Sequence, residues 1–184
     1  TKWNKGHLPV MFASYQEFVG QGSQRQRIDS HLGDNPTQTF DNLWTSVKGS
    51  LHKFGRYSTW FYLQHLRHTA GVDMEPSSLM LSDYSGSRSH RNGLLLAAGR
   101  DDDYDRKLDD RDYESLEGFA REILQEVRVR YPHLAKEADF FTMETCLCSY
   151  KKIFRKHHGR YLGYYLDRAA DEIKKVEDDG WYGI

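Results

Sequence analysis

Cysteine is scarce in this sequence of 184 residues, which contains only Cys146 and Cys148. Side chains two residues apart on a helix point to different faces, so the pair is poorly placed to form a disulfide or to hold one metal ion. No second cysteine pair is present to complete a zinc site. We therefore expect two reduced thiols, as is usual in the cytosol.

Long apolar runs and an excess of one charge are also missing. No stretch approaches the roughly 18 consecutive apolar residues of a membrane-spanning helix, so we expect no membrane partner. Lys and Arg number 26 against 27 Asp and Glu, for a net charge of −1. This balance excludes a histone-like polycation but does not exclude a local basic patch that binds nucleic acid.

Aromatic residues, by contrast, are plentiful, with 12 Tyr, 9 Phe and 4 Trp. Disordered chains are poor in such residues, and each one can bury roughly 150–250 Å². The length suits one domain, because single cores typically organise about 100–200 residues. We therefore expect a folded chain with one modest core.

Apolar residues recur with a helical period from Phe40 onward, whereas residues 1–39 show no sustained period. We therefore predict an irregular N-terminal segment over residues 1–39 and a single, mainly α domain over residues 40–184. No stretch alternates apolar and polar residues over the length of a strand. The predicted helices cover residues 40–51, 57–70, 94–98, 112–131, 140–150 and 162–176, and residues 72–92 are predicted to be a loop.

A Ser-rich stretch at residues 83–93 precedes the predicted helix at residues 94–98. Small residues let the backbone approach an anion closely, and the first N–H groups of a helix lack partners within the helix. Arg88 and Arg91 add charge that matches phosphate oxygens. The stretch therefore suits a phosphate or pyrophosphate, or it is an ordinary polar loop whose Ser and Asn side chains cap helices. Composition alone favours neither.

Aspartates at positions 1, 3, 5, 9 and 12 of residues 101–112 resemble the spacing of a calcium loop. Position 6 is Arg106 instead of Gly, and position 12 is Asp112 instead of the bidentate Glu. We therefore favour a solvated loop that caps a helix. Asp101 and Asp102 follow Arg100 directly and are still candidates to help hold a divalent ion on a phosphate.

Basic residues gather at residues 151–160, which hold five Lys or Arg, two His and no acidic residue. Aromatic residues lie within and beside this stretch, among them Tyr150 and Phe154. Positive charge interleaved with flat rings suits a phosphodiester backbone and exposed bases. The alternative is a basic surface with no specific ligand.

Two further charged residues stand out by their neighbours. Arg56 precedes a predicted helix, where it could bind phosphate or pair with a carboxylate. Glu144 lies among apolar residues, and a carboxylate in such surroundings has a raised pKa and can act as a base. It could equally be the buried partner of an arginine, and spacing does not choose between these roles.

Three segments, taken together, resemble a known family. They are residues 54–58 with 62–67, residues 83–93 followed by 99–102, and residues 141–151. The family is the bacteriophage amino acid:DNA transferases, also called α-glutamyl/putrescinyl thymine pyrophosphorylases. The resemblance covers roughly residues 50–178, and residues 1–39 contribute nothing to it.

The resemblance implies an enzyme of DNA hypermodification in the cytoplasm of an infected bacterium. Its substrates would be DNA that contains pyrophosphorylated 5-hydroxymethyluracil and a small amine, either an amino acid or putrescine. The amine would displace the pyrophosphate and leave a hypermodified thymine. Members of the family are thought to be helical and distantly like helix-hairpin-helix DNA glycosylases. We expect no organic cofactor, and Mg²⁺ is the candidate metal.

This chemistry assigns roles to the residues singled out above. The arginines and the backbone of residues 87–92 would hold the leaving pyrophosphate, and His90 or Glu144 would accept a proton from the amine. The candidate catalytic residues are Asp83, His90 and Glu144; the candidate pyrophosphate ligands are Arg56, Ser85, Ser87, Arg88, Arg91, Asn92, Arg100 and Lys151; the candidate DNA ligands are Lys152, Arg155, Lys156 and Arg160; and the candidate metal ligands are Asp101 and Asp102.

Two other functions are consistent with the sequence. A non-catalytic helical DNA-binding module, attached to a 5-hydroxymethyluracil DNA kinase, would bind DNA in a salt-dependent way without turnover. A base-excising relative of the glycosylases would release a free base and leave an abasic site.

Overall fold

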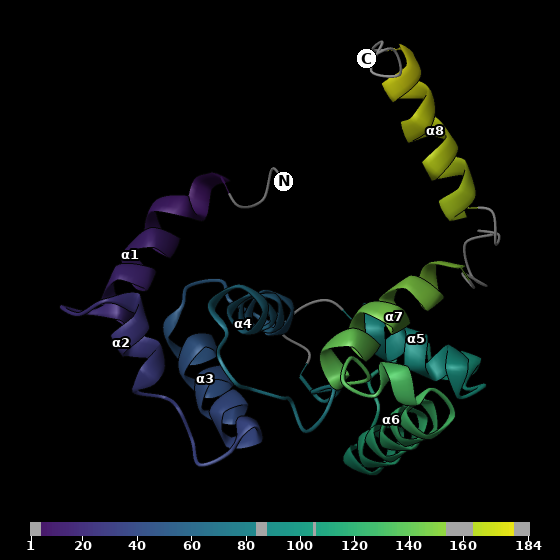
Figure 1. Ribbon diagram of the computed structural model, residues 1–184, viewed down its shortest axis with the longest axis horizontal. Helices are drawn as coiled ribbons and strands as arrows, with labels where there is room; N and C mark the ends of the chain where they lie inside the picture. The colour runs from purple at the N-terminus through teal and green to yellow at the C-terminus, as the bar shows by residue number, and fades with distance from the viewer. Residues whose placement is uncertain (1–4, 84–87, 105, 154–163, 179–184) are drawn as a thin grey trace. The chain divides into compact units, whose positions relative to one another are not determined.

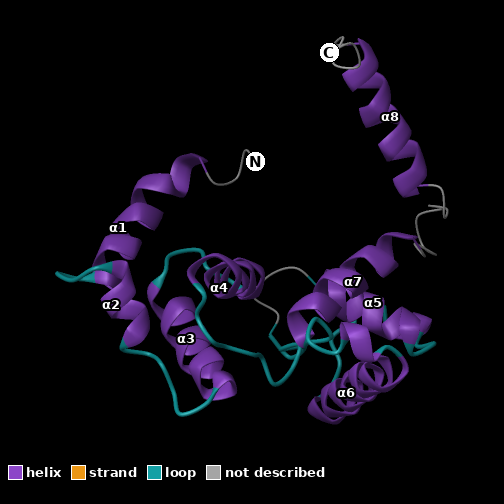
Figure 2. Cartoon of the chain, in the orientation of Figure 1, coloured by secondary structure: helices purple, strands orange, loops and turns teal. Residues whose placement is uncertain are grey.

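Helices are the only regular elements in the part of the chain that the structure, a computed structural model, describes (Figure 2). That part comprises residues 5–83, 88–104, 106–153 and 164–178. The mainly α prediction is confirmed. The α-helices are α1 (Leu8–Val19), α2 (Gln24–Asp29), α3 (Pro36–Ser50), α4 (Arg56–Ala70), α5 (Ser89–Ala97), α6 (Asp110–Arg130), α7 (Phe140–Ile153) and α8 (Tyr164–Asp178), and the short 3-10 helices are η1 (Lys5–His7), η2 (Asp101–Asp103) and η3 (Pro132–Leu134).

The chain divides into two compact units, each made of two separate stretches of sequence. Unit 1 comprises residues 1–88 and 108–143 and holds α1 to α4, α6 and the start of α7. Unit 2 comprises residues 89–107 and 144–184 and holds α5, the rest of α7 and α8 (Figure 1). The boundary predicted at residue 40 is wrong, because it falls inside α3.

The prediction of an irregular segment over residues 1–39 is also wrong, because α1, α2 and the start of α3 lie there. A capping box at Ser23 and Gln26 begins α2, and Asn35 caps α3 by accepting a hydrogen bond from the N–H of Gln38. Only Phe18 is buried in α1 and only Ile28 in α2. Because each of these helices buries only one residue, neither has an apolar face that would produce a helical period in the sequence.

The core of unit 1 is built from stacked and edge-on rings. Phe40 and Trp44 of α3 pack on Trp60 of α4, with ring centres 5.7 and 6.2 Å from the indole. Phe141, at the start of α7, lies 5.1 Å from Trp60. Such aromatic pairs add roughly 0.5–1.5 kcal/mol each beyond their buried area. The helical period of α3 and α4 therefore reflects one shared core.

Two buried charged side chains fasten the loop that follows α4. Arg56 donates from a guanidinium nitrogen to the carbonyl of Leu79 at 2.9 Å and lies 4.7 Å from the centre of the Trp60 ring. The carboxylate of Glu117 accepts hydrogen bonds from the N–H groups of Leu79 and Leu81 at 2.8 and 3.0 Å. Burial raises the pKa of Glu117, and the two hydrogen bonds and nearby arginines partly oppose this shift.

The long helix α6 follows its sequence signals closely. Asp109 caps it by accepting a hydrogen bond from the N–H of Asp112 at 2.8 Å. Acidic residues lie in its first turn, and Arg128 and Arg130 lie in its last turn, as the helix dipole favours. Arg128 also donates to the carbonyl of Ala138 at 2.9 Å, which ties the end of α6 to the start of α7.

Helix α8 lies within unit 2. Its described side chains from Ala169 to Val176 are exposed, including those of Ile173 and Val176. No helix in the described ranges is both long and apolar enough to cross a membrane.

Candidate active site

Helix α5 begins at Ser89, five residues before the position that the apolar pattern predicts. His90, Arg91 and Asn92 therefore lie in its first turn and not in a loop, and all three are buried. The prediction of a loop over residues 72–92 is wrong for these last residues. Polar residues in a first turn resemble a loop in sequence, and only packing against another helix shows that they are buried.

Helix α5 makes a close contact with α7 at Gly93, directly after these buried residues. A Cβ atom added to Gly93 would lie 2.1 Å from the carbonyl oxygen of Leu147 and 2.7 Å from its carbonyl carbon. No side chain fits in this space, so the two backbones touch only because residue 93 is Gly. The contact brings the first turn of α5 against one face of α7.

A buried imidazole and a buried carboxylate meet at this contact. Nδ1 of His90 lies 3.9 Å from Oε1 of Glu144, and the two residues are 2% and 6% exposed. The Sγ atom of Cys148, one turn further along α7, lies 3.7 Å from the same carboxylate oxygen. A carboxylate and an imidazole therefore lie side by side, screened from water.

An ammonium group lies at the same end of the contact. Nζ of Lys151 donates to the hydroxyl of Ser89 at 3.3 Å and lies 5.7 Å from the centre of the Tyr104 ring. Glu144, Cys148 and Lys151 are spaced at i, i+4 and i+7, which places them on one face of α7. This surface of α7, with Ser89 and His90 of α5, is called the α5–α7 cluster below.

Three further predicted pyrophosphate ligands of unit 2, Arg91, Asn92 and Arg100, lie close to the cluster in sequence but have different partners in the structure. Arg91 and Asn92 are 1% and 0% exposed, and a guanidinium nitrogen of Arg91 donates to the side-chain oxygen of Asn92 at 3.3 Å. Arg100 donates from two nitrogens to Asp103 at 2.8 and 2.6 Å. Their role toward pyrophosphate stays a prediction.

The candidate metal ligands Asp101 and Asp102 lie in η2, and Asp102 is exposed. No group of three or more His, Cys, Asp or Glu in the described ranges is placed to share an ion. Mg²⁺ usually takes only one or two carboxylates, together with phosphate oxygens of the substrate. Two neighbouring aspartates suit such an arrangement. Binding of Mg²⁺ at Asp101 and Asp102 together with pyrophosphate therefore stays a prediction.

Three other predicted residues belong to unit 1. Arg56 is fully buried at the loop described above, and Asp83 forms an ion pair with Lys48. Arg88 is exposed. Ser85, Ser87, Arg155, Lys156 and Arg160 lie outside the described residues, and Lys152 is exposed in the last turn of α7.

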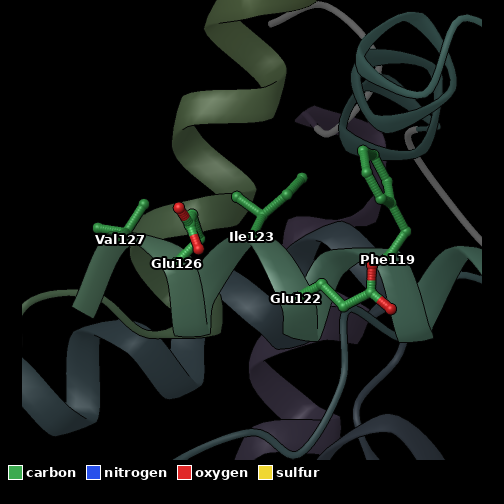
Figure 3. Close-up of a pocket in the computed structure, with 5 residues that line it drawn as sticks. All are labelled: Phe119, Glu122, Ile123, Glu126 and Val127. Atoms are coloured by element: carbon green, nitrogen blue, oxygen red, sulfur yellow. The ribbon is translucent and has the colours of Figure 1, made fainter. Parts of the chain in front are cut away.

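A shallow apolar hollow of about 340 Å³ lies along α6 in unit 1 (Figure 3). Phe119, Ile123 and Val127 line it, and the carboxylates of Glu122 and Glu126 lie beside them. Carboxylates at its rim repel phosphate, so we do not assign this hollow to a nucleic-acid or pyrophosphate ligand.

Comparison with known proteins decides the family. Residues 1–158 match the family of amino acid:DNA transferases. The chain belongs to this family. The matched region begins at residue 1, so the inference that residues 1–39 contribute nothing to the resemblance is wrong.

Among curated proteins, a serinyltransferase of Salmonella phage ViI is similar to this chain. The two are 29% identical over 193 aligned positions, which cover 96% of this chain and 46% of the relative. The chain therefore spans about half the length of that relative. No solved structure matches the chain.

Sequence reasoning missed two members of the α5–α7 cluster in this transferase-family chain, Ser89 and Cys148. The spacing of four residues from Glu144 to Cys148 could have indicated a shared helix face. Ser89 could be found only by placing the start of α5 correctly. Gly93 is the signal that was available, because Gly within an apolar helix often marks a close approach of another backbone.

Proposed function

We propose that this chain carries the transfer step of a DNA-modifying enzyme. In this reaction an amine replaces the pyrophosphate of 5-pyrophosphoryloxymethyluracil in DNA, in the cytoplasm of an infected bacterium. Membership of the amino acid:DNA transferase family and the name of the phage relative support an amino acid as the amine. The observation that carries the proposal is the α5–α7 cluster, which holds a carboxylate, an imidazole and an ammonium together.

The reaction needs a neutral amine and a stabilised leaving group. The nitrogen lone pair attacks the exocyclic methylene carbon, a C–N bond forms, and the C–O bond breaks with its electron pair moving onto pyrophosphate. The attacking nitrogen gains a positive charge and must lose a proton. Glu144 and His90 lie 3.9 Å apart, and either can accept this proton or pass it to the other.

Lys151 supplies a positive charge opposite in sign to that of the leaving pyrophosphate. Its hydrogen bond to Ser89 holds the ammonium group at the start of α5, where backbone N–H groups also favour an anion. Negative charge grows on the leaving oxygen as the C–O bond breaks, so a fixed positive charge lowers the barrier more than it strengthens substrate binding. Any Mg²⁺ held by Asp101 and Asp102 would neutralise further charge on the pyrophosphate.

The test is a transfer assay with the chain as it stands. DNA that contains pyrophosphorylated hydroxymethyluracil is incubated with the protein, Mg²⁺ and a mixture of amino acids and putrescine, then digested to nucleosides for mass spectrometry. We expect an amine adduct of thymidine and one pyrophosphate released per adduct. DNA binding without any adduct would contradict the proposal.

The second candidate is the binding module, and the observation that favours it is the 46% coverage of the relative. In that case the amine site would lie in a segment that corresponds to the uncovered part of the relative, and not in this chain. Adding that segment would then be required before any adduct forms.

A further inference from the structure

Four rings project from the outward face of α4 in unit 1. Tyr57, Phe61, His65 and His68 are spaced by four, four and three residues, which places them in one line along the helix. All four are exposed, whereas Trp60 and its apolar neighbours on the opposite face are buried. The core of unit 1 therefore does not account for this line of rings, which we call the α4 ring stripe.

The first two rings of the stripe form a stacked pair in solvent. The centres of Tyr57 and Phe61 are 5.8 Å apart, with 29° between the ring planes. The two residues are 49% and 58% exposed. Two adjacent exposed rings of this size are informative, because isolated surface apolar residues are common but stacked exposed pairs present a continuous flat surface.

The segment of sequence that carries the stripe contains no acidic residue. No Asp or Glu occurs between Asp41 and Asp73, although acidic and basic residues are balanced in the chain as a whole. Lys48 and Arg67 of this segment pair with carboxylates, and Arg56 is buried. Lys53 is exposed just before the stripe begins. A polyanion with flat groups complements this surface better than an apolar protein face does.

We propose that the α4 ring stripe is a stacking surface for unpaired bases of the DNA substrate. The inference rests on the proposed function, which makes DNA the substrate. Every base has a π face, so rings bind bases of any sequence once the strand is opened, and nearby positive charge attracts the phosphates. The stripe would therefore hold single-stranded or locally opened DNA without reading its sequence.

The test compares two DNA ligands of equal length and charge. Fluorescence anisotropy gives the dissociation constants of a labelled oligothymidylate and of an abasic oligonucleotide for the full chain. Phe61→Ala is expected to weaken oligothymidylate binding about 5- to 100-fold, as loss of one base stack does, and to leave the abasic ligand unchanged. Phe61→Trp is expected to restore binding. Phe12→Ala is the matched control, because Phe12 is 65% exposed on α1, outside the stripe.

Three results would contradict the proposal that the stripe stacks on bases. The wild type could bind the two ligands with equal affinity, Phe61→Ala could lose affinity equally for both ligands, or Phe61→Ala could lose affinity for neither. A change of oligomeric state in the variant would show instead that the stripe binds protein. Circular dichroism checks folding, and Tyr57→Ala replaces Phe61→Ala if the latter does not fold. Binding of neither ligand by the wild type would count against the proposed function itself.

Discussion

Lys151 shows how one residue of the α5–α7 cluster can be tested apart from the rest. Replacing it by Met removes the charge that we propose to stabilise the leaving pyrophosphate and keeps much of the side-chain volume. We expect the transfer rate to fall about 100-fold, the usual cost of losing one preorganised group. Lys107→Met is the control, because Lys107 is an exposed lysine of the same unit. Equal rates in the two variants would contradict this role of Lys151.

Glu117 allows a second test, of stability and not of activity. Burial raises its pKa above the ordinary value of 4.5, so the folded state holds this proton more tightly than the unfolded state does. The contribution of protonated Glu117 to the stability of the folded state is therefore complete below about pH 4.5, and it is lost as the pH rises through the raised pKa.

Gln cannot titrate, so Glu117→Gln isolates this effect. The free energy of unfolding of the wild type should fall relative to that of Glu117→Gln as the pH rises through this range. Urea titrations at a series of pH values measure the difference. A difference that stays constant with pH would show that the pKa of Glu117 is not raised in the folded state.

Between whole elements, the contact of α5 with α7 is the feature on which the site depends. Gly93→Ala would place a methyl group 2.1 Å from the Leu147 carbonyl oxygen and push the two helices apart. We expect a loss of stability of about 1–3 kcal/mol, as for other overpacked sites, and a loss of transfer activity. Thermal denaturation and the transfer assay measure these effects.

Gly118→Ala provides the matched comparison for that experiment. Gly118 also lies inside a helix, α6, but nothing lies within 4 Å of an added Cβ atom. Ala favours a helix over Gly by up to about 1 kcal/mol, so this variant should be as stable as the wild type or more stable. Similar losses in both variants would show that the α5–α7 contact has no special role.

The helices differ in how well they could be predicted from the sequence. Helices α3, α4 and α6 were predictable, because each combines an apolar stripe with a capping residue or a terminal Gly, such as Gly71 at the end of α4. Helices α1 and α2 were not, because each buries one residue. His90, Glu144 and Lys151 could be named from their residue types. Their convergence could not, because it depends on packing at Gly93.

For the whole molecule, DNA binding should depend on the basic residues at 151–160. Replacing Lys152, Arg155 and Lys156 with Gln should weaken binding to all sequences alike, because phosphate interactions carry no sequence information. The slope of log affinity against log salt should become shallower by about one for each phosphate that is no longer neutralised. Titrations at several salt concentrations measure both effects. A weaker affinity for one sequence alone would contradict this role.

The central claim is that the α5–α7 cluster performs the transfer, and single-turnover release of pyrophosphate tests it most directly. The assay compares the wild type with Glu144→Gln and with Glu126→Gln, an exposed carboxylate of α6 outside the cluster. We predict that Glu144→Gln slows release about 100-fold or more, as expected for loss of a general base, while Glu126→Gln matches the wild type. Wild-type rates in a folded Glu144→Gln variant would contradict the account.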